Sequence, residues 1–123
     1  PKRCGHTRGK QVVARDEARL RIRAAVDALE GGADLLVMAR TDARAVLGME
    51  EALERCRAFA DLGADILFLE APQSERELEA FCEAFPRIPK MVNLVEEGDT
   101  PNLPHDRLEA MGFRIAAYPL TLL

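Results

Sequence analysis

The sequence predicts an α/β fold built on a parallel sheet, and three observations support this class. Helical segments alternate with short apolar segments along the whole chain. The apolar segments contain no alternating polar residues, which is typical of strands that are covered on both faces. Gly32–Leu36 and Gly63–Leu67 are near copies, spaced about one βα unit apart. Alternation of this kind predicts right-handed crossovers between parallel strands.

The first half of the chain contains two predicted helices and one predicted strand. The helix over 16–29 has apolar residues on one stripe, and Gly31 and Gly32 follow it as a stop signal. The continuous apolar run at 35–39 predicts a buried strand. The next helix, over 49–62, has three glutamates in its first turns, where carboxylates favour the helix dipole.

The second half repeats the pattern with clearer boundary signals. Ser74 and Glu77 form a capping box at a helix start, and Pro86 ends that helix. Pro104 suits the first position of a further helix, which ends at Gly112. The predicted elements are a strand at 66–69, a helix from 74 to 85, a strand at 91–92, a helix from 104 to 112 and a strand at 113–118.

Four parallel strands fit two architectures. They can form a small doubly wound sheet, or half of an eight-stranded barrel of about 250 residues. In both, ligands bind at the carboxyl ends of the strands. Arg40, Glu70, Asn93 and Tyr118 each stand at such an end, after an otherwise apolar segment. A single polar residue there can simply meet solvent, but this set of four favours a binding site.

Composition narrows the function classes. The chain is 48% hydrophobic and 31% charged, which is a globular composition. Its net charge of −4 gives no general attraction to nucleic acid or to anionic membranes. No apolar run reaches the roughly 18 residues of a membrane span. Three cysteines in a chain with no export signal favour reduced thiols and a cytoplasmic location, and their spacing matches no zinc pattern.

The two ends of the sequence are unusual. The chain opens at Pro1 without a methionine and closes on the apolar stretch Tyr118–Leu123. Natural termini usually lie at the surface and fray. We therefore expect a piece of a longer protein.

Five segments together resemble one known enzyme group. They are Lys2-Arg3-Cys4-Gly5-His6, Ala39-Arg40-Thr41-Asp42-Ala43, Phe68-Leu69-Glu70-Ala71, Met91–Gly98 with Thr100-Pro101, and Tyr118-Pro119-Leu120. In this order and spacing they resemble the isocitrate lyase/phosphoenolpyruvate mutase superfamily, and within it the 2-methylisocitrate lyase-like members. The resemblance implies strands five to eight of a (β/α)8 TIM-type barrel with the active-site loop that precedes them. Residues 1–123 would then be the C-terminal half of a barrel catalytic domain.

The resemblance also implies a reaction. Such enzymes are C–C lyases that cleave a 2-hydroxy di- or tricarboxylate, such as 2-methylisocitrate, by retro-aldol chemistry to pyruvate or glyoxylate and a second carboxylic acid. Mg2+ (or Mn2+) holds the 2-hydroxy acid half, and the residues that bind it belong to the first half of the barrel. A cysteine on a mobile loop protonates the carbanion, which places the catalytic role on Cys4. Neighbouring cations can lower the pKa of a thiol and suit it to this task.

The remaining site residues would bind substrate. The resemblance makes Arg40 a carboxylate clamp, for which a guanidinium is suited because it can bind two oxygens at once. It places Glu70 near the metal-bound end of the substrate. The implied substrate-binding residues are Gly5, His6, Arg40, Glu70, Asn93, Leu94 and Val95, with the last two acting through the backbone.

Other functions remain open at this point. Oxaloacetate decarboxylases and enzymes that form or break P–C bonds belong to the same superfamily, although the Cys-Gly-His loop favours C–C lyases. A different possibility is a non-enzymatic half-barrel that self-assembles or binds a partner. For the enzyme we expect a small carboxylate substrate, no nucleic acid or membrane partner, and a homo-oligomer, a tetramer, in the full-length protein.

Overall fold

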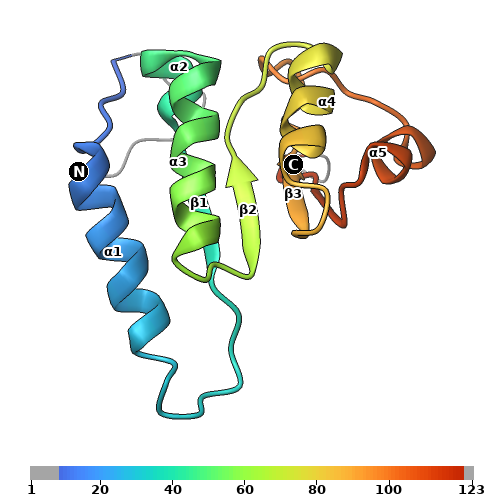
Figure 1. Cartoon of the computed structure of the whole chain (residues 1–123). Helices are drawn as coiled ribbons and strands as arrows, with labels where there is room; N and C mark the ends of the chain where they lie inside the picture. Colours follow the sequence, from blue (N-terminus) through green and yellow to red (C-terminus); the bar gives the residue numbers. More distant parts are fainter. Residues whose placement is uncertain (1–8, 121–123) are drawn as a thin grey trace.

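A computed structural model describes residues 9–120, and its strands form one parallel sheet in the order β1-β2-β3-β4. The strands are β1 (Met38–Thr41), β2 (Ile66–Leu69), β3 (Lys90–Asn93) and β4 (Ile115–Ala117). The helices are α1 (Arg15–Asp27), α2 (Ala43–Leu47), α3 (Met49–Asp61), α4 (Glu75–Ala84) and α5 (His105–Met111). Figure 1 shows α3 and α4 in front of the strands, with α1 beside α3 and α5 beside α4.

The strand order decides between the two architectures. Each strand pairs with the next one in the sequence, whereas a doubly wound sheet reverses its order at a switch point and carries helices on both faces. In Figure 1 helices α3 and α4 lie over one face of the sheet. The sheet therefore has the arrangement of consecutive units of a (β/α)8 barrel.

The two faces of the sheet differ in burial. On the face that packs against the helices, Leu67, Leu69 and Val92 are almost completely buried. The strand register places Arg40 opposite Phe68 and Met91 opposite Ile115 on the other face. On this second face, both edge strands carry partly exposed apolar side chains. Met38 of β1 is 39% exposed and Ile115 of β4 is 37% exposed. In a closed barrel this second face lines the interior.

The strand predicted at 35–39 is wrong in position. β1 begins at Met38 and extends through Arg40 to Thr41. Leu35 and Leu36 lie in the loop before it, 69% and 71% exposed. An apolar run marks a buried strand only where a neighbouring segment covers it, and no segment of residues 9–120 buries these two side chains. α2 was not predicted, because five residues are too few to show a helical period.

The helix boundary signals hold with three differences. α1 ends at Asp27, with Ala28 as its C-cap, and so ends before Gly31 and Gly32, which were predicted to stop it. Ser74 caps α4 by accepting a hydrogen bond from the Glu77 N–H at 3.2 Å, as predicted. The Glu77 carboxylate, however, accepts from the backbone N–H of Gln73 at 2.8 Å and not from that of Ser74. Pro104 is the residue before α5, with an extended ψ of 151°, and does not occupy its first position. Gly112 ends α5 in a left-handed conformation with a φ of 109°.

The helices of the described region are amphipathic and short. None of those within residues 9–120 combines the length and apolar character that crossing a lipid bilayer requires.

Candidate active site

Three of the predicted site residues meet at the carboxyl edge of the sheet. Arg40 lies on β1, Asn93 ends β3, and Glu70 directly follows β2 between them. The Asn93 side-chain amide donates to Glu70 Oε1 at 3.3 Å, and Arg40 Nη2 lies 3.3 Å from Glu70 Oε2. Glu70 is only 1% exposed. Side chains from the two flanking strands thus converge on the buried carboxylate that follows β2.

Arg40 is held from several sides. Its Nε and Nη2 donate to the two carboxylate oxygens of Asp42, at 2.7 and 3.1 Å. The guanidinium carbon lies 5.0 Å from the centre of the Phe68 ring, within the range of a cation–π contact. The Arg40 side chain is nevertheless 41% exposed. A cation in this position can meet an anionic ligand at the sheet edge without first leaving a buried site.

Asp42 and Lys10 extend the cluster, and sequence reasoning did not assign either to the site. Lys10 Nζ donates to Asp42 Oδ2 at 2.6 Å, and the Lys10 side chain is only 8% exposed. Burial acts to raise the pKa of Asp42, but the hydrogen bonds from Arg40 and Lys10 outweigh it and hold that pKa below its ordinary value. Asp42 is therefore a carboxylate at neutral pH. Asp42 belongs to the family-like segment Ala39-Arg40-Thr41-Asp42-Ala43, but nothing in the sequence indicated its contact with Lys10.

The loop after β3 has its own hydrogen bonds. The backbone N–H of Leu94 donates to the carbonyl of Ala117 at 2.8 Å, and Leu94 is buried. The carbonyl of Val95 accepts from the N–H of Gly98 at 2.9 Å. These bonds tie the loop to β4 and fold it back on itself. Substrate contacts of Leu94 and Val95 stay a prediction.

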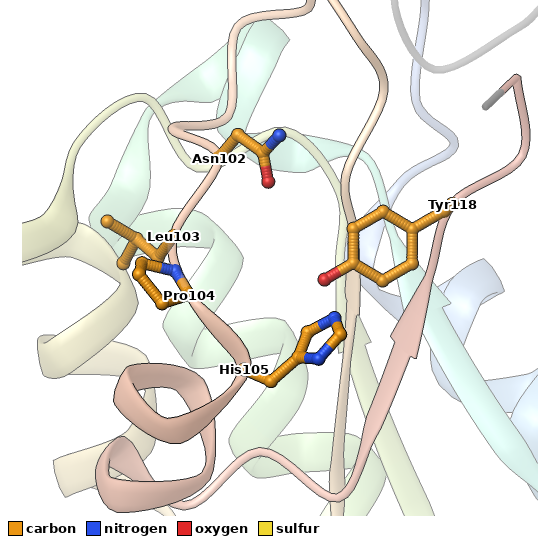
Figure 2. Close-up of a pocket in the computed structure, with 5 residues that line it drawn as sticks. All are labelled: Asn102, Leu103, Pro104, His105 and Tyr118. Atoms are coloured by element: carbon orange, nitrogen blue, oxygen red, sulfur yellow. The ribbon is translucent and has the colours of Figure 1, made fainter.

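Tyr118 lies elsewhere on the same edge, beside His105. Their rings are 5.6 Å apart in an edge-to-face arrangement. Figure 2 shows the Tyr118 hydroxyl, the His105 imidazole and the Asn102 amide around a shared open pocket, which has a volume of about 490 Å³. Leu103 and Pro104 complete its lining. His105 itself is exposed, as expected from its place at a helix start.

The two cysteines of the described region are not nucleophiles. Burial raises the pKa of Cys56 to about 12 and that of Cys82 to about 11. Thiols of this kind are unreactive near neutral pH. The predicted catalytic Cys4, with Gly5 and His6, lies outside the described residues. No group of three or more His, Cys, Asp or Glu side chains within residues 9–120 could hold a metal ion.

Comparison with known protein families shows the family to which this chain belongs. The family model of phosphoenolpyruvate phosphomutase matches residues 3–123. Because this match covers almost the whole chain, the chain belongs to that family. The superfamily that the sequence motifs predicted is therefore confirmed.

The similar proteins include lyases and a hydrolase. The chain is 43% identical over its whole length to 2-methylisocitrate lyase of Bacillus subtilis, and covers 40% of that protein. It is similar to the crystal structure of 2,3-dimethylmalate lyase, with 42% identity, a TM-score of 0.92, and 96% of this chain and 40% of that one covered. It is also similar to oxaloacetate acetylhydrolase in complex with the inhibitor 3,3-difluorooxalacetate, with 45% identity and a TM-score of 0.91. That match covers 95% of this chain and 40% of the hydrolase chain. The chain thus spans about two fifths of these relatives, as expected for part of a barrel.

Proposed function

We propose that this chain is the C-terminal half of the barrel of a C–C lyase that cleaves a small 2-hydroxy di- or tricarboxylate of the 2-methylisocitrate type. The observation that carries the proposal is the convergence of Arg40, Glu70 and Asn93 from three neighbouring strands at one edge. Barrel enzymes build their active sites at this edge. The names of the relatives 2-methylisocitrate lyase and 2,3-dimethylmalate lyase support the substrate class.

The proposed reaction divides the substrate at the bond between its hydroxyl-bearing carbon and the next carbon. The hydroxyl loses a proton and becomes the keto group of pyruvate, while the electrons of the broken bond pass to the second fragment. That fragment is a carbanion stabilised by its own carboxylate, and it takes up one proton to become the second carboxylic acid. In this scheme the proton comes from the thiol of Cys4. The resulting thiolate takes up a proton before the next turnover, which balances the proton that the hydroxyl released to solvent.

The described residues would bind and orient the substrate. The Arg40 guanidinium would pair with a substrate carboxylate, because a planar fork of N–H donors matches two carboxylate oxygens. Glu70 would accept a hydrogen bond from the 2-hydroxyl group. The Asn93 amide, which contacts Glu70 in the present structure, would donate to a second carboxylate. Together they would fix both ends of the bond that breaks.

We propose Mg2+ or Mn2+ as the cofactor, held by residues outside this chain. We further propose a cytoplasmic, homo-oligomeric enzyme, a tetramer, with a small carboxylate as its substrate and no nucleic-acid or membrane partner. The related structure of oxaloacetate acetylhydrolase favours a second candidate, in which the same edge binds oxaloacetate. Both candidates break the bond between the oxygen-bearing carbon and the next carbon. In the hydrolysis of oxaloacetate, water would first add to the keto group, so that the first fragment leaves as oxalate and not as pyruvate.

The experiment is a substrate panel with the full-length protein and Mg2+. 2-Methylisocitrate would give pyruvate and succinate, 2,3-dimethylmalate would give pyruvate and propionate, and hydrolysis of oxaloacetate would give oxalate and acetate. Product analysis by mass spectrometry separates these outcomes. A phosphonate completes the panel, and if it alone is turned over, the C–C lyase proposal is wrong.

A cysteine variant tests the proton donor. Cys4→Ser should lower kcat by about 10²-fold or more, the usual effect of removing a positioned acid, while binding of pyruvate changes little. Cys82→Ala is the matched control, because the Cys82 thiol is buried and its pKa is raised. It should keep kcat within about twofold. A Cys4→Ser enzyme with more than about a tenth of normal turnover would show that Cys4 does not donate the proton.

A further inference from the structure

The Asp42 carboxylate contacts two cations that come from distant parts of the chain. Arg40 reaches it from the same strand end, with donor–acceptor distances of 2.7 and 3.1 Å. Lys10 reaches it from the segment that precedes α1, at 2.6 Å. Asp42 is 19% exposed and Lys10 8%, so solvent screens their contact less than it would a surface pair.

The side chain of Asp42 does not cap the helix that it precedes, although aspartate often does so at this position. Asp42 directly precedes α2, and aspartate at that position commonly accepts a hydrogen bond from the first turn of its helix. Here it makes no capping hydrogen bond. Instead, the Thr41 hydroxyl accepts from the N–H of Ala43 at 3.2 Å. The Asp42 carboxylate is thus directed at the two cations.

The contacts of Arg40 differ in kind. Both nitrogens on its Nε side form hydrogen bonds with Asp42. Its contact with Glu70 is a 3.3 Å ion pair through Nη2. Charge-assisted hydrogen bonds through two nitrogens fix the plane of a guanidinium, whereas a single longer contact does not. Asp42 therefore determines the direction in which Arg40 faces, with the Phe68 ring below it.

We propose that Asp42 is a positioning residue for substrate binding. It orients the Arg40 guanidinium towards the substrate carboxylate and holds the Lys10 ammonium beside it. This inference rests on the proposed function, in which Arg40 binds a carboxylate. An incoming carboxylate would then compete with Glu70 for Nη2 and would leave the Asp42 contact intact. Without the Asp42 charge, Arg40 would turn towards the buried Glu70 carboxylate and meet the substrate less often.

The kinetic test uses the full-length protein and three variants. Asp42→Asn keeps the shape but removes the charge, and it should raise KM about fivefold with kcat changed less than about twofold. In an Arg40→Gln background, Asp42→Asn should lower kcat/KM by less than a further twofold, because the two residues act as one unit. Independent, multiplicative effects of the two substitutions would overturn the proposal.

Glu77→Gln is the matched control. Glu77 also accepts two hydrogen bonds from one arginine, Arg44, at 2.9 and 2.6 Å, but it lies on α4. Burial acts to raise the pKa of both Asp42 and Glu77, but hydrogen bonds from arginine contribute to lowering both pKa values below their ordinary range. Glu77→Gln should lower the unfolding temperature and leave KM within about twofold. If Asp42→Asn behaves like Glu77→Gln, Asp42 is only structural.

Hydrogen exchange at Arg40 tests the positioning role of Asp42 without any enzymatic assay. In protein labelled with 15N-arginine, the Nε–H of Arg40 should exchange slowly with water, because it donates to Asp42. Arg40→Lys identifies the signal, and Asp42→Asn should speed its exchange at least about tenfold. Equal exchange in both proteins overturns the positioning role. Absence of turnover on the whole substrate panel, with exchange that depends on Asp42, would refute the proposed function alone.

Discussion

Glu70 and Lys90 are two buried charges at opposite ends of the same sheet, and their partners differ. Glu70 follows the carboxyl end of β2 and is 1% exposed, while Lys90 begins β3 and is 2% exposed. Lys90 Nζ donates to the backbone carbonyls of Phe85 and Ile88, at 2.7 and 2.8 Å. Glu70 instead meets the side chains of Arg40 and Asn93, each at 3.3 Å.

The difference separates a structural charge from one that can act on a ligand. The backbone carbonyls of Phe85, the C-cap of α4, and of Ile88, in the loop that follows, cannot turn away from Lys90, and the short bonds to them close the α4–β3 connection. Side chains such as Arg40 and Asn93 can turn, so a ligand can replace one contact of Glu70 with another. A buried charge is expensive unless it is paired. We infer that the buried charge of Lys90 stabilises the fold, whereas the buried charge of Glu70 serves substrate binding.

The largest expected effect is that of Glu70→Gln on activity. Removing this charge should lower kcat/KM of the full-length enzyme by about 10²-fold, because Glu70 is the proposed acceptor for the 2-hydroxyl group and a neutral amide accepts that hydrogen bond more weakly than a carboxylate does. The unfolding temperature should change little, because Gln has the same shape and Arg40 keeps its bonds to Asp42. Steady-state kinetics and calorimetry test the two halves. A large fall in stability without loss of activity would make Glu70 a second structural charge.

The site could be predicted from the sequence where it depends on local rules. Arg40, Glu70 and Asn93 follow apolar segments, and parallel strands bring their carboxyl ends to one edge. The contact between Lys10 and Asp42 could not be predicted in the same way. Their separation of 32 residues includes all of α1, and its length and packing determine where Lys10 lies.

The fold shows the same limit. Two helices with cap signals, α4 after Ser74 and α5 before Gly112, lie within one residue of their predicted bounds, whereas α1 ends two residues earlier than predicted. The strand expected at 35–39 was misplaced, because an apolar run does not reveal which of its residues a neighbour will cover. β1 pairs with β2 from Met38 onward, and that register depends on tertiary contacts. The burial of Lys90 could not be predicted, because a lysine beside Pro89 has the sequence context of an exposed loop residue.

The second expected effect is on stability alone. Lys90→Met fills the same space but removes both hydrogen bonds to the carbonyls of Phe85 and Ile88. Two buried carbonyls without these donors should cost about 2 kcal/mol in the free energy of unfolding, partly offset by the loss of a buried charge. KM and kcat should stay within about twofold. Unfolding in urea, followed beside the assay, measures both.

Arg114→Met is the control for that variant. Arg114 is near Lys90 in the fold and lies at the same end of the sheet, where its N–H donates to the Lys90 carbonyl at 3.0 Å. Its side chain is 65% exposed, so the free energy of unfolding should change by less than about 0.5 kcal/mol. If Lys90→Met alters kcat/KM more than Glu70→Gln does, the division between a structural and a functional end of the sheet is wrong.

The smallest expected effect is a dependence of stability on pH that belongs to Lys90. Burial lowers the pKa of Lys90 from its ordinary value of 10.5, with a further contribution from the Arg114 charge, although Cys82 acts in the opposite direction. Between the lowered pKa and 10.5, the unfolded chain therefore binds more protons at this site than the folded one. Stability then rises with pH in that window. A neutral amine still has two N–H groups, so both carbonyl bonds survive the loss of the proton.

The measurement is the difference in unfolding free energy between the unmodified protein and Lys90→Met at pH 7.5, 8.5 and 9.5. Taking the difference cancels the groups that titrate alike in both proteins, including the thiols that ionise in the unfolded chain. Stopping at pH 9.5 keeps the Cys82 thiol protonated in the folded protein, where its pKa is raised to about 11. The advantage of the unmodified protein should grow as pH rises, by no more than about 1 kcal/mol. An advantage that shrinks with pH would mean that the fold prefers the charged ammonium, and that its bonds to Phe85 and Ile88 outweigh the cost of burial.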